Sequence, residues 1–148
     1  MAAVFFLQCH NIECTKSIWL PPVKHLDTTC DHDSWPADGL PRNFVCRACG
    51  VIASYARSES RCHVRPRPKL IEELRPLSLI CTELTCGQEG CESPFLILSL
   101  GSKLLATTMS SLPGATAIDA LCERGHAQNG LILPDSRFFA RPVFDWNL

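Results

Sequence analysis

Cysteine and histidine are the residues of this chain whose type and spacing could bind a metal ion. The 148 residues include ten cysteines and five histidines. Four residues separate Cys9 from Cys14, and two residues separate Cys46 from Cys49. Zn²⁺ is bound tetrahedrally, and structural sites are closed shells of four thiolate or imidazole ligands. Two hairpin tips that supply two ligands each could form such a shell.

The same arrangement occurs a second time along the chain. Four residues again separate one pair of cysteines, and three residues separate a cysteine from a histidine. Four candidate ligands recurring at nearly one period indicate an internal repeat. At offsets of 77, 77, 76 and 77 positions, the second set is Cys86, Cys91, Cys122 and His126, after Cys9, Cys14, Cys46 and Cys49.

The stretch FVCRACG at 44–50 resembles the knuckle of the zinc-ribbon class, in which two rubredoxin-like knuckles on β-hairpins bind one zinc ion. This resemblance implies two tandem zinc ribbons with two Zn²⁺ ions per chain. It assigns one ion to Cys9, Cys14, Cys46 and Cys49, and the other to Cys86, Cys91, Cys122 and His126. The first pair of each set has a longer gap than usual, and Cys81 is an alternative to His126 as fourth ligand of the second set.

Iron is the alternative metal, because four thiolates also suit a rubredoxin-like electron carrier. The gap of four residues between Cys9 and Cys14 departs from the rubredoxin pattern and favours zinc. Three cysteines remain unassigned, and nearby histidines could activate a thiol or add a metal site. No spacing directs any histidine toward them, so we expect packing roles for Cys30, Cys62 and Cys81.

The hydrophobic pattern predicts a mostly β fold with irregular loops. Helical propensity is confined to 68–75 and 115–121. Three prolines within 65–76 indicate a stiff linker between a first ribbon at 1–64 and a second at 77–148, and the two ribbons could be separate or packed together. The expected strands are 3–8, 17–20, 42–45, 51–56, 77–81, 95–100, 118–121 and 130–133.

Basic residues are concentrated between Arg42 and Lys69, although the formal net charge of the chain is −1. Such a stripe beside an aromatic side chain is what a nucleic-acid surface needs, whereas an acidic loop nearby favours an ordinary charged face. Nucleic-acid binding is therefore the alternative function, and binding that weakens steeply with salt would identify it. Its candidate residues are Arg47, Tyr55, Arg57, Arg61, Arg65 and Arg67.

The sequence favours a structural zinc protein that serves as a macromolecular interaction module, with a protein as the expected partner. We find no catalytic motif and therefore expect no enzyme activity and no small-molecule substrate. No apolar run reaches the length of a membrane span, and the N-terminus lacks the features of a signal peptide, so we expect a cytoplasmic protein without a membrane partner. The aromatic segment at 137–146 should pack on its own ribbon or bind a partner.

Overall fold

The structure is a computed structural model, and it describes residues 2–20, 35–36, 38–65, 77–102, 117–131 and 137–142. In these ranges it contains β-strands and one 3₁₀ turn, which confirms the mostly β fold class. No helix in the described part of the chain is long and apolar enough to cross a membrane. The elements are β1 (Ala2–Gln8), β2 (Ser17–Trp19), β3 (Arg42–Val45), β4 (Ile52–Tyr55), η1 (Arg57–Glu59), β5 (Arg61–Arg65), β6 (Leu77–Thr85), β7 (Pro94–Ser102), β8 (Ala117–Leu121), β9 (Ala127–Leu131) and β10 (Arg137–Pro142).

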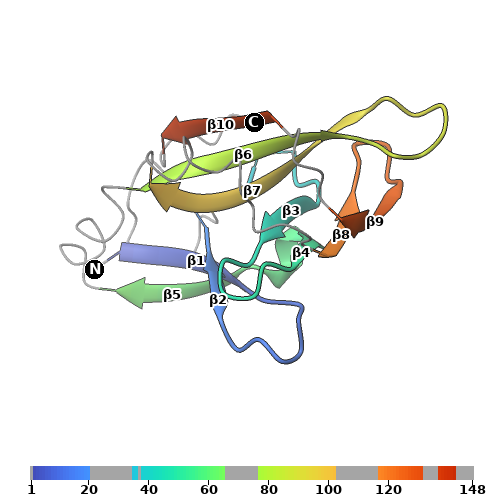
Figure 1. Ribbon diagram of the computed structural model, residues 1–148. Helices are drawn as coiled ribbons and strands as arrows, with labels where there is room; N and C mark the ends of the chain where they lie inside the picture. Colours follow the sequence, from blue (N-terminus) through green and yellow to red (C-terminus); the bar gives the residue numbers. More distant parts are fainter. Residues whose placement is uncertain are drawn as a thin grey trace.

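The strands form two sheets (Figure 1). The smaller sheet has three strands in the order β2-β1-β5, and all its pairs are antiparallel. The larger sheet has seven strands in the order β10-β6-β7-β3-β4-β8-β9. The hairpin β3-β4 therefore lies inside the larger sheet, between strands that come from the other end of the chain.

Two parallel contacts join the halves of the chain. Strand β3 pairs with β7 through Asn43 and Ile97, and β4 pairs with β8 through Ile52 and Ile118. Parallel neighbours need not be close in sequence, and these paired residues are 54 and 66 positions apart (97 − 43 and 118 − 52). The two predicted ribbon regions, for which separate and packed arrangements were both open, thus share one sheet.

The strand registers of the two halves correspond. Gln8 lies opposite Ser17 in the β1-β2 pair, and Thr85 lies opposite Pro94 in the β6-β7 pair, each 77 positions later. The outer strands correspond as well, because β5 pairs with β1 as β10 pairs with β6. Arg61 of β5 lies opposite Phe6, and Arg137 of β10, 76 positions after Arg61, lies opposite Glu83, 77 positions after Phe6.

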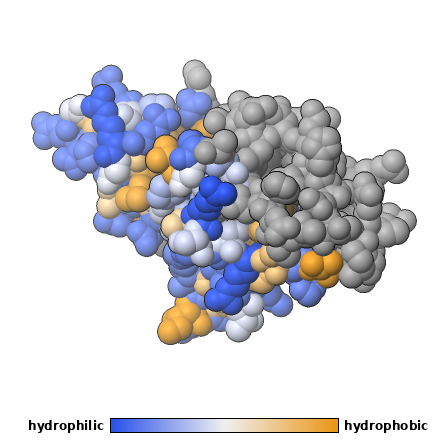
Figure 2. Space-filling model, turned by 180° about the vertical axis from the view of Figure 1, so that it is seen from behind, coloured by the Kyte–Doolittle hydropathy of each residue, from blue (hydrophilic) through white to orange (hydrophobic). Residues whose placement is uncertain are grey.

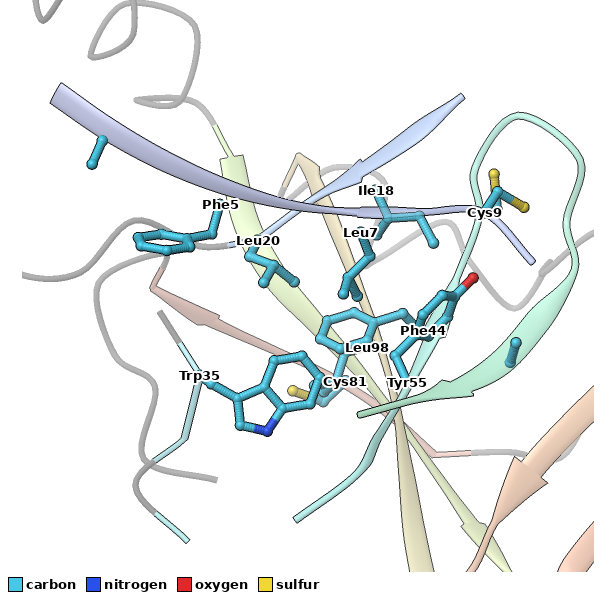
Figure 3. Packing of buried hydrophobic residues seen from close by; sticks show 13 residues of the cluster. Phe5, Leu7, Cys9, Ile18, Leu20, Trp35, Phe44, Tyr55, Cys81 and Leu98 are labelled. Carbon is cyan, nitrogen blue, oxygen red and sulfur yellow. The ribbon is translucent and has the colours of Figure 1, made fainter. Parts of the chain in front are cut away.

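The buried core lies on both sides of the β3-β4 hairpin. Successive side chains of a strand point to opposite faces, and here neighbouring residues contribute to different clusters. Phe44 packs in the larger cluster with Tyr55 and Leu98, whereas Val45 packs in the other cluster with Ile52. Figure 3 shows the larger cluster, in which side chains from both halves converge on Phe44. The hairpin is consequently buried on both faces.

Two sequence-based expectations differ from the structure. Both a strand at 118–121 and helical propensity within 115–121 were expected; residues 117–121 form strand β8, which pairs with β4 and β9, so the strand is confirmed and the helical propensity there is wrong. Strands β5 and β10 were not among the expected strands. Both lie at sheet edges and contain arginines, so their sequences lack the alternating apolar pattern that identifies a half-buried strand. The expected helical segment at 68–75 lies outside the described residues.

Candidate metal centres

The first cluster unites two hairpin ends. Cys9 directly follows β1 and Cys14 precedes β2, while Cys46 directly follows β3 and Cys49 precedes β4. Their four sulfur atoms all lie within 4.8 Å of one another. The Sγ atoms of Cys9 and Cys49 are 3.6 Å apart, and those of Cys14 and Cys46 are 3.7 Å apart. Thiolates about 2.3 Å from a tetrahedral zinc ion would be separated by about 3.8 Å, so the cluster has the size of a zinc site.

Backbone hydrogen bonds close the two loops that carry these cysteines. The N–H of Cys14 donates to the carbonyl of Asn11 over 2.9 Å, and the N–H of Cys46 donates to the carbonyl of Val51 over 2.9 Å. Gly50 has a φ of 74°, a left-handed conformation that side chains with a Cβ rarely adopt. Gly50 allows the chain to turn back directly after Cys49, which brings the second pair of ligands together.

A small polar group supports the Cys9 loop. The hydroxyl of Tyr55 accepts a hydrogen bond of 3.2 Å from the backbone N–H of His10, whose ring lies 4.1 Å from the Tyr55 ring between centroids. His10 Nε2 is 2.6 Å from Glu59 Oε1, and the other carboxylate oxygen of Glu59 accepts from the N–H of Ala56. The loop of the first cluster is thus attached to β4 and η1. The sequence analysis did not identify His10 or Glu59, because their partners are distant in sequence.

The second cluster is built from the corresponding elements. Cys86 directly follows β6, Cys91 precedes β7, Cys122 directly follows β8 and His126 precedes β9. Their ligand atoms also lie within 4.8 Å of one another. Cys86 Sγ and His126 Nδ1 are 3.7 Å apart, close to the separation of about 3.6 Å expected for sulfur and nitrogen ligands of one tetrahedral zinc ion.

The first loops of the two clusters have the same hydrogen bonds. Cys91 N–H donates to the carbonyl of Gln88 over 2.9 Å, as Cys14 N–H donates to that of Asn11, again 77 positions earlier. The following hairpins differ by one residue. Cys46 N–H bonds to the carbonyl of Val51, whereas Cys122 N–H bonds to that of His126. His126 therefore occupies the place of Val51 in its hairpin, although the numerical offset matches it to Cys49.

Burial and hydrogen bonding give the thiols of the first cluster different acidities. Burial raises the pKa of Cys9 to about 12. Burial also raises the pKa of Cys49, but hydrogen bonds from the backbone of Val51 and from the side chains of Cys9 and Asn11 outweigh it and lower that pKa to about 7. In the second cluster, a hydrogen bond from the backbone of Ser93 is the main cause that lowers the pKa of Cys91 to about 6. Cys49 and Cys91 therefore ionise more readily than ordinary thiols, and metal binding would displace protons from ligand thiols that still carry them.

The second cluster includes one further polar side chain. Gln128 of β9 donates from Nε2 to Cys86 Sγ over 3.0 Å and to the His126 carbonyl over 3.0 Å. Its Oε1 accepts from the N–H of Gly87 over 2.9 Å. The sequence analysis missed Gln128, because a glutamine two residues after a ligand has no recognisable signal without the strand pairing.

Two of the cysteines left over by the sequence pattern, Cys62 and Cys81, are described by the structure, and neither belongs to a candidate metal cluster. Cys81 is buried in the larger core cluster, and His126 rather than Cys81 completes the second set of ligand atoms. Cys62 lies on β5 and is disulfide-bonded. Cys30, which was expected to have a packing role, lies outside the described residues.

The candidate nucleic-acid residues that the structure describes differ in their exposure. The Tyr55 side chain is 0% exposed and packs in the core, so the expectation that its ring could stack on a base is wrong. Arg47, Arg57 and Arg61 are exposed, at the Cys46 loop, in η1 and in β5. The backbone of Arg65 belongs to β5, and Arg67 lies outside the described residues.

The chain matches no protein-family model, no curated protein and no solved structure in the comparisons made. The case for its function therefore depends on the two clusters and on the surfaces around them.

Proposed function

We propose that this chain is a structural zinc protein whose two Zn²⁺ ions hold the hairpin ends together. The observation that carries the proposal is the convergence of eight side chains into two groups of four ligand atoms, each within 4.8 Å. The Sγ–Sγ distances of 3.6 and 3.7 Å in the first group support zinc, and the histidine of the second group also suits zinc. Iron in an all-cysteine site is the competing occupant of the first group.

The two metal units are proposed to be copies of one module. Matching registers at an offset of 77 positions in the β1-β2 and β6-β7 pairs support a duplication. The outer strands β5 and β10 extend the correspondence to a fifth strand in each copy. The copies have since diverged at the fourth ligand, where Cys49 and His126 occupy different places in their hairpins.

The zinc ions are proposed to organise the fold and to perform no chemistry. A catalytic zinc site keeps one coordination position for water or substrate, whereas four protein ligands fill a tetrahedral shell. Both groups offer four ligands, and seven of the eight ligands are cysteines, which are typical of structural sites. Four protein ligands without an open coordination position support a non-enzymatic function.

A protein is the proposed partner of the module. Ile12, at the end of the loop between Cys9 and Cys14, is 97% exposed, and Leu40 is 57% exposed. On the face shown in Figure 2, hydrophobic residues form small separate groups among hydrophilic ones. An exposed apolar side chain on a loop held by a metal ion suits a small contact with another protein. The burial of Tyr55 leaves the nucleic-acid alternative without its stacking residue.

Elemental analysis of purified protein tests the metal assignment. The parent should contain about two zinc ions per chain, and Cys9→Ser and His126→Ala should each contain about one, since each removes a ligand of a different group. A red protein that contains iron would overturn the zinc assignment, and a chain without metal would overturn the whole proposal. A single-stranded oligonucleotide that binds and is released steeply by salt would replace the protein partner with nucleic acid.

A further inference from the structure

Gln128 connects the two loops that supply the ligands of the second cluster. Its Oε1 accepts from Gly87 N–H, which belongs to the loop after β6, and its Nε2 donates to the His126 carbonyl, at the start of β9. The second hydrogen of the amide donates to Cys86 Sγ over 3.0 Å. An amide group has two donor hydrogens, and both are used here. One carboxamide therefore contacts the residues on both sides of the cluster.

The first cluster has no equivalent of this side chain. Gln128 lies opposite Ala120 in the β8-β9 hairpin, and the corresponding position of the β3-β4 hairpin is Ala53, opposite Phe44. Ala53 is 1% exposed and has no polar side-chain atom. The hydrogen bond from a side chain to a cysteine sulfur at this position is consequently a property of the second cluster alone.

We propose that Gln128 is a positioning residue of the second metal site, where it orients Cys86 and His126 and withdraws charge from the Cys86 thiolate. The inference rests on the proposed function, because it requires a metal ion at this cluster. Groups that hydrogen-bond to metal ligands orient them and tune the metal, and their removal typically weakens metal affinity about 10- to 100-fold. The first site has Ala53 at the corresponding hairpin position, so this contribution of Gln128 raises the metal affinity of the second site selectively.

Two substitutions separate this role from simple bracing of the hairpin. Gln128→Glu retains an oxygen that can accept from Gly87 N–H, but it directs a second oxygen instead of an N–H toward Cys86 Sγ. Gln128→Met keeps a similar length and removes all three hydrogen bonds. Asn129→Ala is the matched control, because Asn129 is exposed on the same strand and neighbouring side chains point to opposite faces.

The test is cadmium-113 NMR of the full chain, combined with competitive metal titration. The parent should give two resonances, because four sulfur ligands and three sulfurs with one nitrogen shield cadmium differently. In Gln128→Met and Gln128→Glu, the resonance of the second site should shift and its affinity should fall about 10- to 100-fold, while the first site is unchanged. Asn129→Ala should change neither resonance. The first site also serves as the folding control within each variant.

Three outcomes would overturn the proposal. If both Gln128 variants keep the parental shift and affinity at the second site, Gln128 braces the hairpin without acting on the metal. If both variants lose both resonances, Gln128 supports the whole fold and not one site. If the parent itself binds fewer than two cadmium ions, the proposed function fails, and the inference fails with it for that separate reason.

Discussion

Replacing Asn43 by alanine should greatly weaken the junction between the two halves of the chain. Asn43 lies on β3 and is 5% exposed, and its carboxamide bonds to two strands of the other half. Its Nδ2 donates to the carbonyl of Leu96 over 3.2 Å and to that of Leu121 over 3.0 Å, while its Oδ1 accepts from Leu121 N–H over 3.1 Å. Leu121 directly precedes the ligand Cys122, so the junction also positions the second cluster.

The expected size of the effect follows from these three hydrogen bonds. A protein hydrogen bond contributes about 1 kcal/mol net, and a buried backbone group left without a partner costs about 1–3 kcal/mol. Asn43→Ala removes three bonds and leaves the backbone N–H and carbonyl of Leu121 without the carboxamide. We therefore expect a loss of about 3 kcal/mol or more in the free energy of unfolding, a large share of the roughly 5–15 kcal/mol of an ordinary domain.

Urea unfolding of the zinc-loaded protein measures this loss. Trp35 is a suitable reporter, because it is buried and its ring lies 5.9 Å from that of Phe44, next to Asn43 in β3. The control is Asn129→Ala, the same change at an exposed position, which should stay within about 0.5 kcal/mol of the parent. If Asn43→Ala is no more destabilising than this control, the carboxamide does not hold the two halves together and the reasoning is refuted.

Three further predictions concern the metal, the core and a turn. Removal of bound metal by a strong chelator at neutral pH should abolish the β-type circular dichroism, because both clusters hold hairpin ends together and metal binding is coupled to folding. An unchanged melting curve in metal-free protein would contradict this. Burial raises the pKa of Tyr55, the single tyrosine, above its usual value near 10, so the stability that the neutral Tyr55 side chain contributes is present below pH 10 and is lost as pH rises further. Tyrosinate absorbance should therefore appear together with unfolding, and a reversible titration near pH 10 in folded protein would argue against the burial of Tyr55. Gly50→Ala should lower the free energy of unfolding by about 1–2 kcal/mol because the φ of Gly50 is 74°, and Gly50→Asn should lower it less. Thermal melting compares the variants, and equal melting temperatures for Gly50→Ala and the parent would exclude a strained turn.

The ligand sets could be predicted from the sequence because each knuckle is a local structure. A pair of ligands separated by two to four residues comes together through one tight turn, and Gly50 marks that turn by its residue type. The strands 42–45 and 118–121 were also predictable, since short apolar runs next to ligands have few other conformations. Strand β3 has the expected bounds Arg42–Val45, and β8 begins one residue earlier than expected, at Ala117. Local residue types and spacings were thus sufficient for the ligands and for most of the strands.

Tertiary structure alone decided how the two units combine and which polar groups support them. The parallel pairing of β3 with β7 joins strands far apart in sequence, and no periodicity along the chain specifies such a partner. Nothing in the sequence around Asn43 distinguishes it from other polar residues in strands. It connects the two halves only because the folded chain places the carbonyl of Leu96 and the backbone of Leu121 within hydrogen-bonding distance of its side chain. Gln128 likewise has a role only because β9 places it beside Cys86. The sequence by itself determined the pairs of candidate metal ligands, because each pair is brought together by a turn between near neighbours. The shared sheet and the polar contacts depend on long-range packing that only the folded chain provides.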